Sequence, residues 1–132
     1  MTYAISTTVN AGFEQTVADT RAALSDNGFG VLTEIDIKAT MKTKLDVDVP
    51  PQIILGACRP PLAYAAIQAE PSVGLLLPCN VVVRSLDEDT TLVEALDPQV
   101  MVTMTNNDGL RGVADDASVR LSAALASLSD NR

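Results

Sequence analysis

Residues 80–96 read NVVVRSLDEDTTLVEAL, and this stretch decides the fold. Residues 80–86 and 90–96 are both rich in β-branched side chains, and the acidic triplet Asp87-Glu88-Asp89 between them favours a turn. Two β-prone runs joined by so short a turn predict an antiparallel hairpin. We therefore expect a mainly antiparallel sheet.

Three further strands are expected before this hairpin. Residues 2–9 and 29–36 alternate with a period of two, and the continuous apolar run in residues 52–57 is typical of a strand buried on both faces. The positions that alternate are Tyr3, Ile5, Thr7 and Val9 in the first strand, and Phe29, Val31, Thr33 and Ile35 in the second.

Helical spacing of apolar residues appears in four other segments. The segments are residues 13–26, ended by Asn27-Gly28; residues 37–45; residues 62–70, ended by Pro71; and a final helix from about Asp108, capped by Asn107 or Asp108. Residues 73–77 fit either a helical turn or a short strand, and residues 100–105 are ambiguous.

The resulting order is β-α-β-(α)-β-α-β-β-α. It predicts a single α+β domain over residues 1–132, a two-layer sandwich whose helices pack on one face of the sheet. The chain of 132 residues is 47% hydrophobic and 20% charged, which is a globular balance. A chain of this length needs neither a metal nor a disulfide to fold.

Composition argues against several classes of function. The sequence has no histidine, which excludes Ser-His-Asp triads, Cys-His dyads and histidine-ligated zinc. It has no tryptophan and few other aromatic residues, so stacking platforms for single-stranded nucleic acid are not expected. The net charge of −8 disfavours nucleic-acid and anionic-membrane partners.

The charges are unevenly distributed along the chain. Lys38, Lys42 and Lys44 lie close together, whereas the acidic stretch Asp87, Glu88, Asp89, Glu94 and Asp97 has no basic residue within it. Two solvated surface patches explain this pattern. The alternative is that one patch docks on the other in a homodimer.

No targeting or membrane-spanning segment is recognisable. The N-terminal residues carry no basic cluster, and the apolar stretch 73–83 is too short to cross a membrane and contains Pro78 and Asn80. We expect a soluble, cytoplasmic protein. The two cysteines, Cys58 and Cys79, do not require an oxidising compartment.

Cys58 is the strongest candidate for chemistry. It follows the expected buried strand 52–57 and precedes a helix, with Arg59 adjacent. The positive end of a helix dipole and the guanidinium both favour a thiolate, which is the nucleophilic and metal-binding form of cysteine. Cys79 is its candidate partner, because two strand ends at one edge would bring the sulfur atoms together.

Several readings of the two cysteines remain open. They are two buried residues that pack as small hydrophobes, a paired redox or soft-metal site, or a single reactive Cys58. Two thiolates without a CxxC motif form only part of a zinc site, but they suit two-coordinate Cu(I). Met41, Met101 and Met104 are possible thioether ligands, although packing explains them as well.

Glu34, Asp36 and Lys38 form a second candidate group. They alternate along one face from the second expected strand into the following segment. Paired carboxylates perform acid–base chemistry when burial raises the pKa of one of them. A solvated strand face is the simpler explanation.

Three blocks of sequence resemble a known family. They are residues 28–40 (GFGVLTEIDIKAT), residues 54–63 (ILGACRPPLA) and residues 74–83 (GLLLPCNVVV), and together they resemble the domain of unknown function 302 family. The resemblance spans nearly the whole chain and implies a small α+β domain, often a homodimer. It implies no established reaction, substrate or set of catalytic residues. Arg59 departs from it, since a smaller or polar residue such as asparagine is expected there.

These observations leave three functional hypotheses. The leading one is a small-ligand or soft-metal binding module with Cys58, and with Cys79 as its possible partner, in a site that also includes Arg59, Glu34 and Lys38. The second is an interaction or structural homodimer without chemistry. The third is a thiol-dependent enzyme with Cys58 as nucleophile and Glu34 or Asp36 as acid or base. The identity of the ligand or cofactor is not determined by the sequence.

Overall fold

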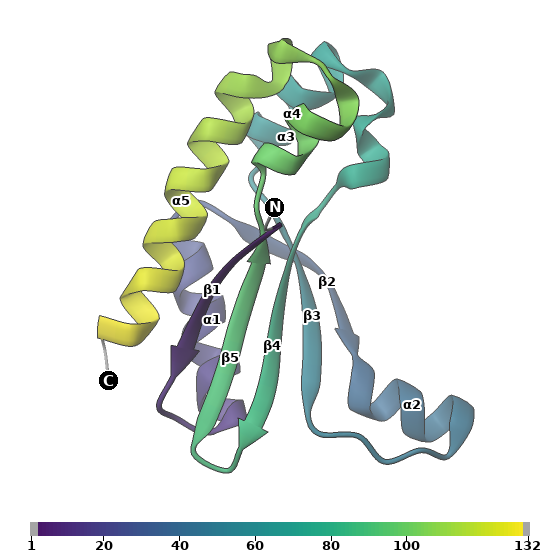
Figure 1. Cartoon of the computed structure of the whole chain (residues 1–132), viewed down its shortest axis with the longest axis vertical. Helices are drawn as coiled ribbons and strands as arrows, with labels where there is room; N and C mark the ends of the chain where they lie inside the picture. The colour runs from purple at the N-terminus through teal and green to yellow at the C-terminus, as the bar shows by residue number, and fades with distance from the viewer. Residues whose placement is uncertain (1–2, 131–132) are drawn as a thin grey trace.

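A five-stranded antiparallel sheet with the strand order β1-β5-β4-β3-β2 organises the molecule (Figure 1). The computed structural model describes residues 3–130, so Thr2 of the first expected strand lies outside the described residues. The predicted α+β class and the terminal hairpin are both confirmed. The strands are β1 (Ala4–Val9), β2 (Gly30–Asp36), β3 (Gln52–Cys58), β4 (Cys79–Asp87) and β5 (Thr90–Leu96).

The helices also follow the prediction closely. They are α1 (Phe13–Asp26), α2 (Ile37–Leu45), α3 (Pro60–Ala69), α4 (Gln99–Thr105) and α5 (Arg111–Asp130), with two 3₁₀ turns, η1 (Pro71–Leu76) and η2 (Asp108–Leu110). Helix α3 begins two residues before the expected Leu62, because proline is well tolerated in a first helical turn. The two undecided segments are η1 and α4.

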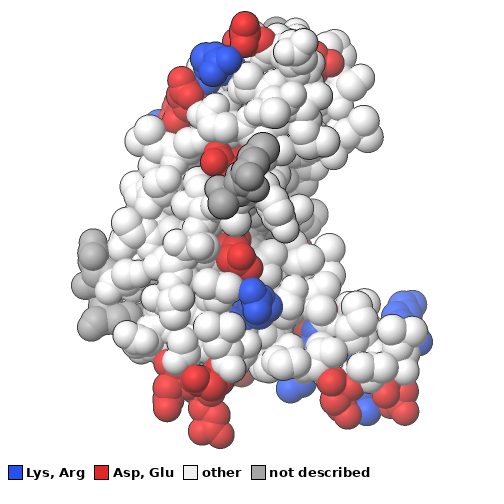
Figure 2. Space-filling model, in the orientation of Figure 1, with Lys and Arg blue, Asp and Glu red and all other residues white. Residues whose placement is uncertain are grey.

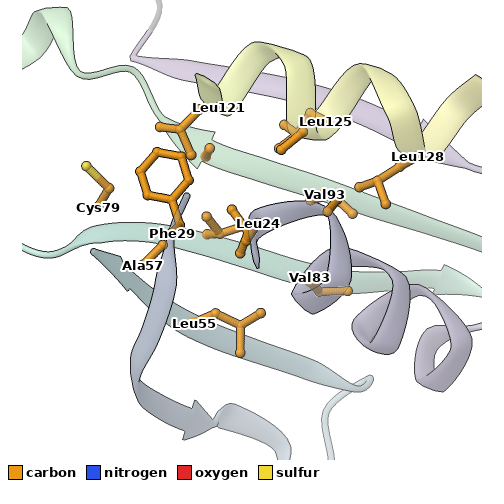
Figure 3. Close-up of a cluster of buried hydrophobic side chains, with 14 of the residues drawn as sticks. Leu24, Phe29, Leu55, Ala57, Cys79, Val83, Val93, Leu121, Leu125 and Leu128 are labelled. Atoms are coloured by element: carbon orange, nitrogen blue, oxygen red, sulfur yellow. The ribbon is translucent and has the colours of Figure 1, made fainter. Parts of the chain in front are cut away.

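One face of the sheet is covered by α1 and α5, and the main core lies between these layers (Figure 3). Leu55 of β3, Leu24 of α1 and Leu121 of α5 are all fully buried there. Thr16 and Thr20 of α1 are also buried, and their hydroxyls donate to the carbonyls of Gly12 and Thr16 at 2.8 and 2.7 Å. The stripe expected for this helix from the sequence includes Thr20 but not Thr16, which lies one turn before it.

A second apolar cluster lies beyond one end of the sheet. It is formed by residues of α3, α4, the two 3₁₀ turns and the first half of α5: Ala66, Val73, Met101, Val102, Leu110 and Ala114. Helix α5 runs along both clusters, from the upper group of helices in Figure 1 down to β1. The junction between the two clusters is where β3 ends and β4 begins.

Strand β2 does not keep the single alternation that the sequence predicts. The register shifts between Val31 and Thr33, so that Val31 lies opposite Ala57 but Thr33 lies opposite Gly56. A β-bulge of this kind moves every later side chain to the other face of the sheet. Phe29 and Val31 therefore contact the core, whereas Thr33 and Ile35 lie on the uncovered face.

Helix α2 projects from the body of the molecule at the end of β2 (Figure 1). None of its residues is buried. In the view of Figure 2, charged side chains gather on this projection and at the ends of the molecule, while most of the face between them is uncharged and is hollowed beside α2. We refer to residues 32–49 as the α2 arm.

Candidate functional site

A small apolar cavity lies at the junction of the two clusters, and both cysteines line it. Its volume is about 30 Å³, which is enough for one or two water-sized groups. We call it the two-cysteine cavity. Its lining residues are Phe29, Ala57, Cys58, Arg59, Leu62, Ala63, Ala66, Leu77, Pro78, Cys79, Met101, Val113 and Ala117.

Cys79 is the first residue of β4 and lies directly opposite Ala57 of β3. Its side chain enters the core beside Phe29 and Leu121 (Figure 3). Burial, and to a smaller extent the nearby charge of Cys58, raises the pKa of the Cys79 thiol from 9.0 to about 11. The Cys79 thiol therefore keeps its proton at neutral pH, because removing it would place a charge in an apolar environment.

Cys58 is the last residue of β3 and is half-buried. It follows Ala57, the partner of Cys79, so the two cysteines are diagonal neighbours on adjacent strands. Both are free thiols. Both residues line the two-cysteine cavity, where the end of β3 and the start of β4 meet.

The helix that follows Cys58 presents no free backbone donor in its first turn. Pro60 and Pro61 have no N–H group, and the N–H groups of Leu62 and Ala63 both donate to the carbonyl of Arg59 at 3.0 Å. A thiolate at Cys58 therefore gains no hydrogen bond from these amides. Among the residues that line the cavity, Arg59 is the one that carries a charge.

Met101 provides a third sulfur atom at the cavity. It lies on α4, is only 2% exposed and lines the two-cysteine cavity. Met104 on the same helix is 67% exposed and is absent from the lining. Sequence reasoning could not separate the two, because residues 100–105 gave no clear period and the helical phase of the segment was unknown.

The acidic candidates lie away from the cysteines. Glu34 is opposite Leu55 in the register and pairs with Arg21, whereas Asp36 caps α2 by accepting from the N–H of Ala39 at 2.9 Å. Lys38 lies exposed on α2. The structure thus brings Cys58, Cys79 and Arg59 together, and it places Glu34, Asp36 and Lys38 on or beside the α2 arm.

Two further kinds of feature are absent from residues 3–130. No group of three or more His, Cys, Asp or Glu side chains is arranged to hold a metal ion. No helix in this range is long and apolar enough to cross a membrane. Any metal site in the two-cysteine cavity would therefore depend on two thiolates and on Met101.

Comparison with known proteins places the chain in a wider group. The profile of the family described as "Domain of unknown function DUF302" matches residues 5–128. Among solved structures, the chain is similar to the crystal structure of an uncharacterized conserved DUF302 protein from Bacillus stearothermophilus, with 29% identity and a TM-score of 0.86. The similarity covers 96% of this chain and 98% of that one. No curated protein matches the chain.

Proposed function

This chain belongs to the DUF302 family, and we propose that its two-cysteine cavity binds one soft monovalent metal ion, Cu(I). The observation that carries the proposal is the convergence of three sulfur-bearing side chains, Cys58, Cys79 and Met101, on a single cavity. Thiolate and thioether ligands select Cu(I) over harder ions. Two thiolates would provide the main bonds, and the thioether would provide a weaker third.

The size of the cavity favours an ion over an organic ligand. A volume of about 30 Å³ is far below the roughly 300–1,000 Å³ that is typical of small-molecule sites. The surrounding walls are apolar, apart from Arg59. A bare ion bound by sulfur fits such a space, whereas a metabolite of ordinary size does not.

The charges also balance. A Cu(I) ion held by two thiolates carries a net charge of −1, and an uncompensated anion in an apolar cavity is costly. Arg59 lines the same cavity and is the charged residue available to offset this charge. In the absence of metal, the raised pKa of Cys79 keeps that thiol neutral.

Metal binding at this site must release the proton of Cys79. Because the Cys79 thiol has a pKa of about 11, the affinity for Cu(I) should increase with pH throughout the neutral range. This dependence distinguishes binding in the cavity from binding at surface carboxylates, whose protonation does not change at neutral pH.

The test is anaerobic transfer of Cu(I) from a colorimetric chelator to the reduced protein. We expect one equivalent per chain in the wild type, and loss of transfer in Cys58→Ser and Cys79→Ser. Met101→Leu should weaken binding, whereas Met104→Leu is the matched control on the same helix and should leave binding unchanged. Absence of stoichiometric transfer to a folded wild-type protein, or transfer to both cysteine variants equal to that of the wild type, would rule the proposal out.

A second candidate function, a homodimer without chemistry, is supported by the uncovered face of the sheet. Ile35 on this face is 48% exposed, and Leu32, Leu45 and Val47 of the α2 arm are at least 45% exposed. Lys38 and Lys44 on the arm are complementary in charge to the acidic hairpin turn at residues 87–89. We propose a second copy of this chain as the occupant of this surface.

The oligomeric state provides the test of this second candidate. Light scattering after size-exclusion chromatography should give the mass of a dimer for the wild type and that of a monomer for Ile35→Glu. Val119→Glu is the matched control, because Val119 is 71% exposed on α5 and lies outside the proposed surface. A monomeric wild type at high protein concentration would exclude this function.

The proposed location is the cytoplasm. Cys58 and Cys79 are free thiols in neighbouring positions. Paired thiols persist in a reducing compartment and tend to be oxidised elsewhere.

A further inference from the structure

Two arginines converge beside the two-cysteine cavity. Gly28, in the turn after α1, adopts a left-handed conformation with φ of +87°. A Cβ atom on Gly28 would lie 3.1 Å from Nε of Arg59 and 3.3 Å from Nη1 of Arg120. Both guanidinium groups therefore lie over Gly28. Arg59 directly follows the last residue of β3, and Arg120 lies on α5.

The two arginines differ in how their charge is balanced. Arg120 donates from Nε to Asp116 at 2.6 Å and from Nη1 to the carbonyl of Asn27 at 3.3 Å. These contacts fix the position of its guanidinium and offset its charge. Arg59 takes part in none of the ion pairs found within residues 3–130.

Arg59 also has an unused donor in a buried position. Its Nε atom is shielded from solvent and has no hydrogen-bond acceptor among the described residues. A buried donor without an acceptor is costly, and a charged one more so. The chain places this cation next to a second cation, although the protein as a whole carries a net charge of −8.

We propose that Arg59 and Arg120 form a binding site for a small oxyanion at the rim of the two-cysteine cavity. Guanidinium groups hold the oxygen atoms of such anions through paired, charge-assisted hydrogen bonds. The anion supplies the acceptor that Arg59 Nε lacks. The absence of a side chain on Gly28 leaves room for both arginines.

The site adjoins the cavity through both of its arginines. Arg59 follows Cys58 directly, and Arg120 lies one turn along α5 from Ala117, which lines the cavity. An anion held here is next to the thiols without occupying the space among the sulfur atoms. The proposal does not depend on metal binding, and its test uses the metal-free protein.

The test is a titration of the reduced, metal-free protein with sodium sulfate, followed by NMR of the arginine side chains at constant ionic strength set with sodium chloride. We expect the Nε–Hε signal of Arg59 to shift and saturate. Arg59→Gln should abolish saturable binding, and Arg120→Gln should weaken it about tenfold, the effect of losing one charge-assisted hydrogen bond. A parallel titration with sodium acetate distinguishes tetrahedral oxyanions from carboxylates.

Arg111→Gln is the matched control. Arg111 lies on the same helix as Arg120 and likewise pairs with an aspartate, Asp108, at 2.9 Å. It is the first residue of α5, about two and a half helical turns before Arg120, so it lies outside the proposed site. If Arg59→Gln fails to fold, Arg59→Lys keeps the positive charge while removing the planar donor pair, and it should still weaken binding. Shifts that grow linearly, or that are equal at all arginines, would indicate an adventitious ion only and would overturn the proposal.

Discussion

We predict that Cys79→Ala changes how the stability of the protein depends on pH above pH 9. In the folded protein the Cys79 thiol has a pKa of about 11, raised by burial and then by Cys58, whereas in the unfolded chain it titrates at its ordinary value of 9.0. A group whose pKa is raised in the folded state contributes stability that is fully present below the unfolded pKa. That contribution is lost as the pH rises from 9 to 11.

The size of the effect follows from the shift. A difference of about two pKa units corresponds to roughly 2–3 kcal/mol, most of which the wild type should have lost at pH 11. Truncation to alanine removes one buried sulfur atom, at a cost of about 1 kcal/mol at any pH. Cys79→Ala should therefore be less stable than the wild type at pH 7.5 and more stable at pH 11.

The assay is urea denaturation of both proteins under reducing conditions at pH 7.5, 9, 10 and 11. The difference in the free energy of unfolding between the two proteins at each pH removes the contribution of the titratable groups that both proteins share. Cys58→Ala should still lose most of this stability between pH 9 and pH 11, because Cys58 is only the smaller cause of the raised pKa of Cys79. A stability difference between Cys79→Ala and wild type that is the same at pH 7.5 and pH 11 would refute the reasoning.

Three other substitution or labelling experiments address the cavity, the turn and the core. Iodoacetamide at pH 8, followed by peptide mapping, should label half-buried Cys58 more than about tenfold faster than Cys79, since Cys79 is buried and keeps its proton to about pH 11; equal rates would contradict this. Gly28→Ala should lose about 1–2 kcal/mol of stability, because φ is +87° and the new Cβ would lie 3.1 Å from a guanidinium nitrogen. Gly112 lies on α5, and a Cβ atom added there would meet no atom within 4 Å, so Gly112→Ala should instead gain up to about 1 kcal/mol of stability. A loss of stability in both glycine variants would argue against this explanation. Leu55→Ala should cost about 2–5 kcal/mol in urea denaturation because Leu55 is 0% exposed, and a loss below 1 kcal/mol would show that the site collapses around the smaller side chain.

The sequence predicted element types well where the local signal was strong. The spacing of Leu121, Leu125 and Leu128 identified the final helix, and all three side chains are buried. The hairpin was predicted equally well, because β-branched runs and an acidic turn favour the same local structure. Both signals depend on neighbours along the chain, so they could be recognised without the fold.

The bulge in β2 could not be predicted in the same way. An extra residue between Val31 and Thr33 moves Ile35 from the expected core face to the uncovered face. No residue type in that segment requires the bulge. It follows from how β2 pairs with β3, where the hydroxyl of Thr33 lies over Gly56, a position at which any Cβ atom would clash.

For the candidate site, the sequence by itself determined which chemistry is available. The lack of histidine, the two cysteines and the Pro60-Pro61 helix start are visible in the amino-acid order, and they led to Cys58, Cys79 and Arg59. Only the tertiary structure decided which side chains accompany them, because strand register and helix phase set contacts between distant residues. Register placed Cys79 opposite Ala57, beside Cys58, while the packing of α4 and α5 brought in Met101 and Arg120.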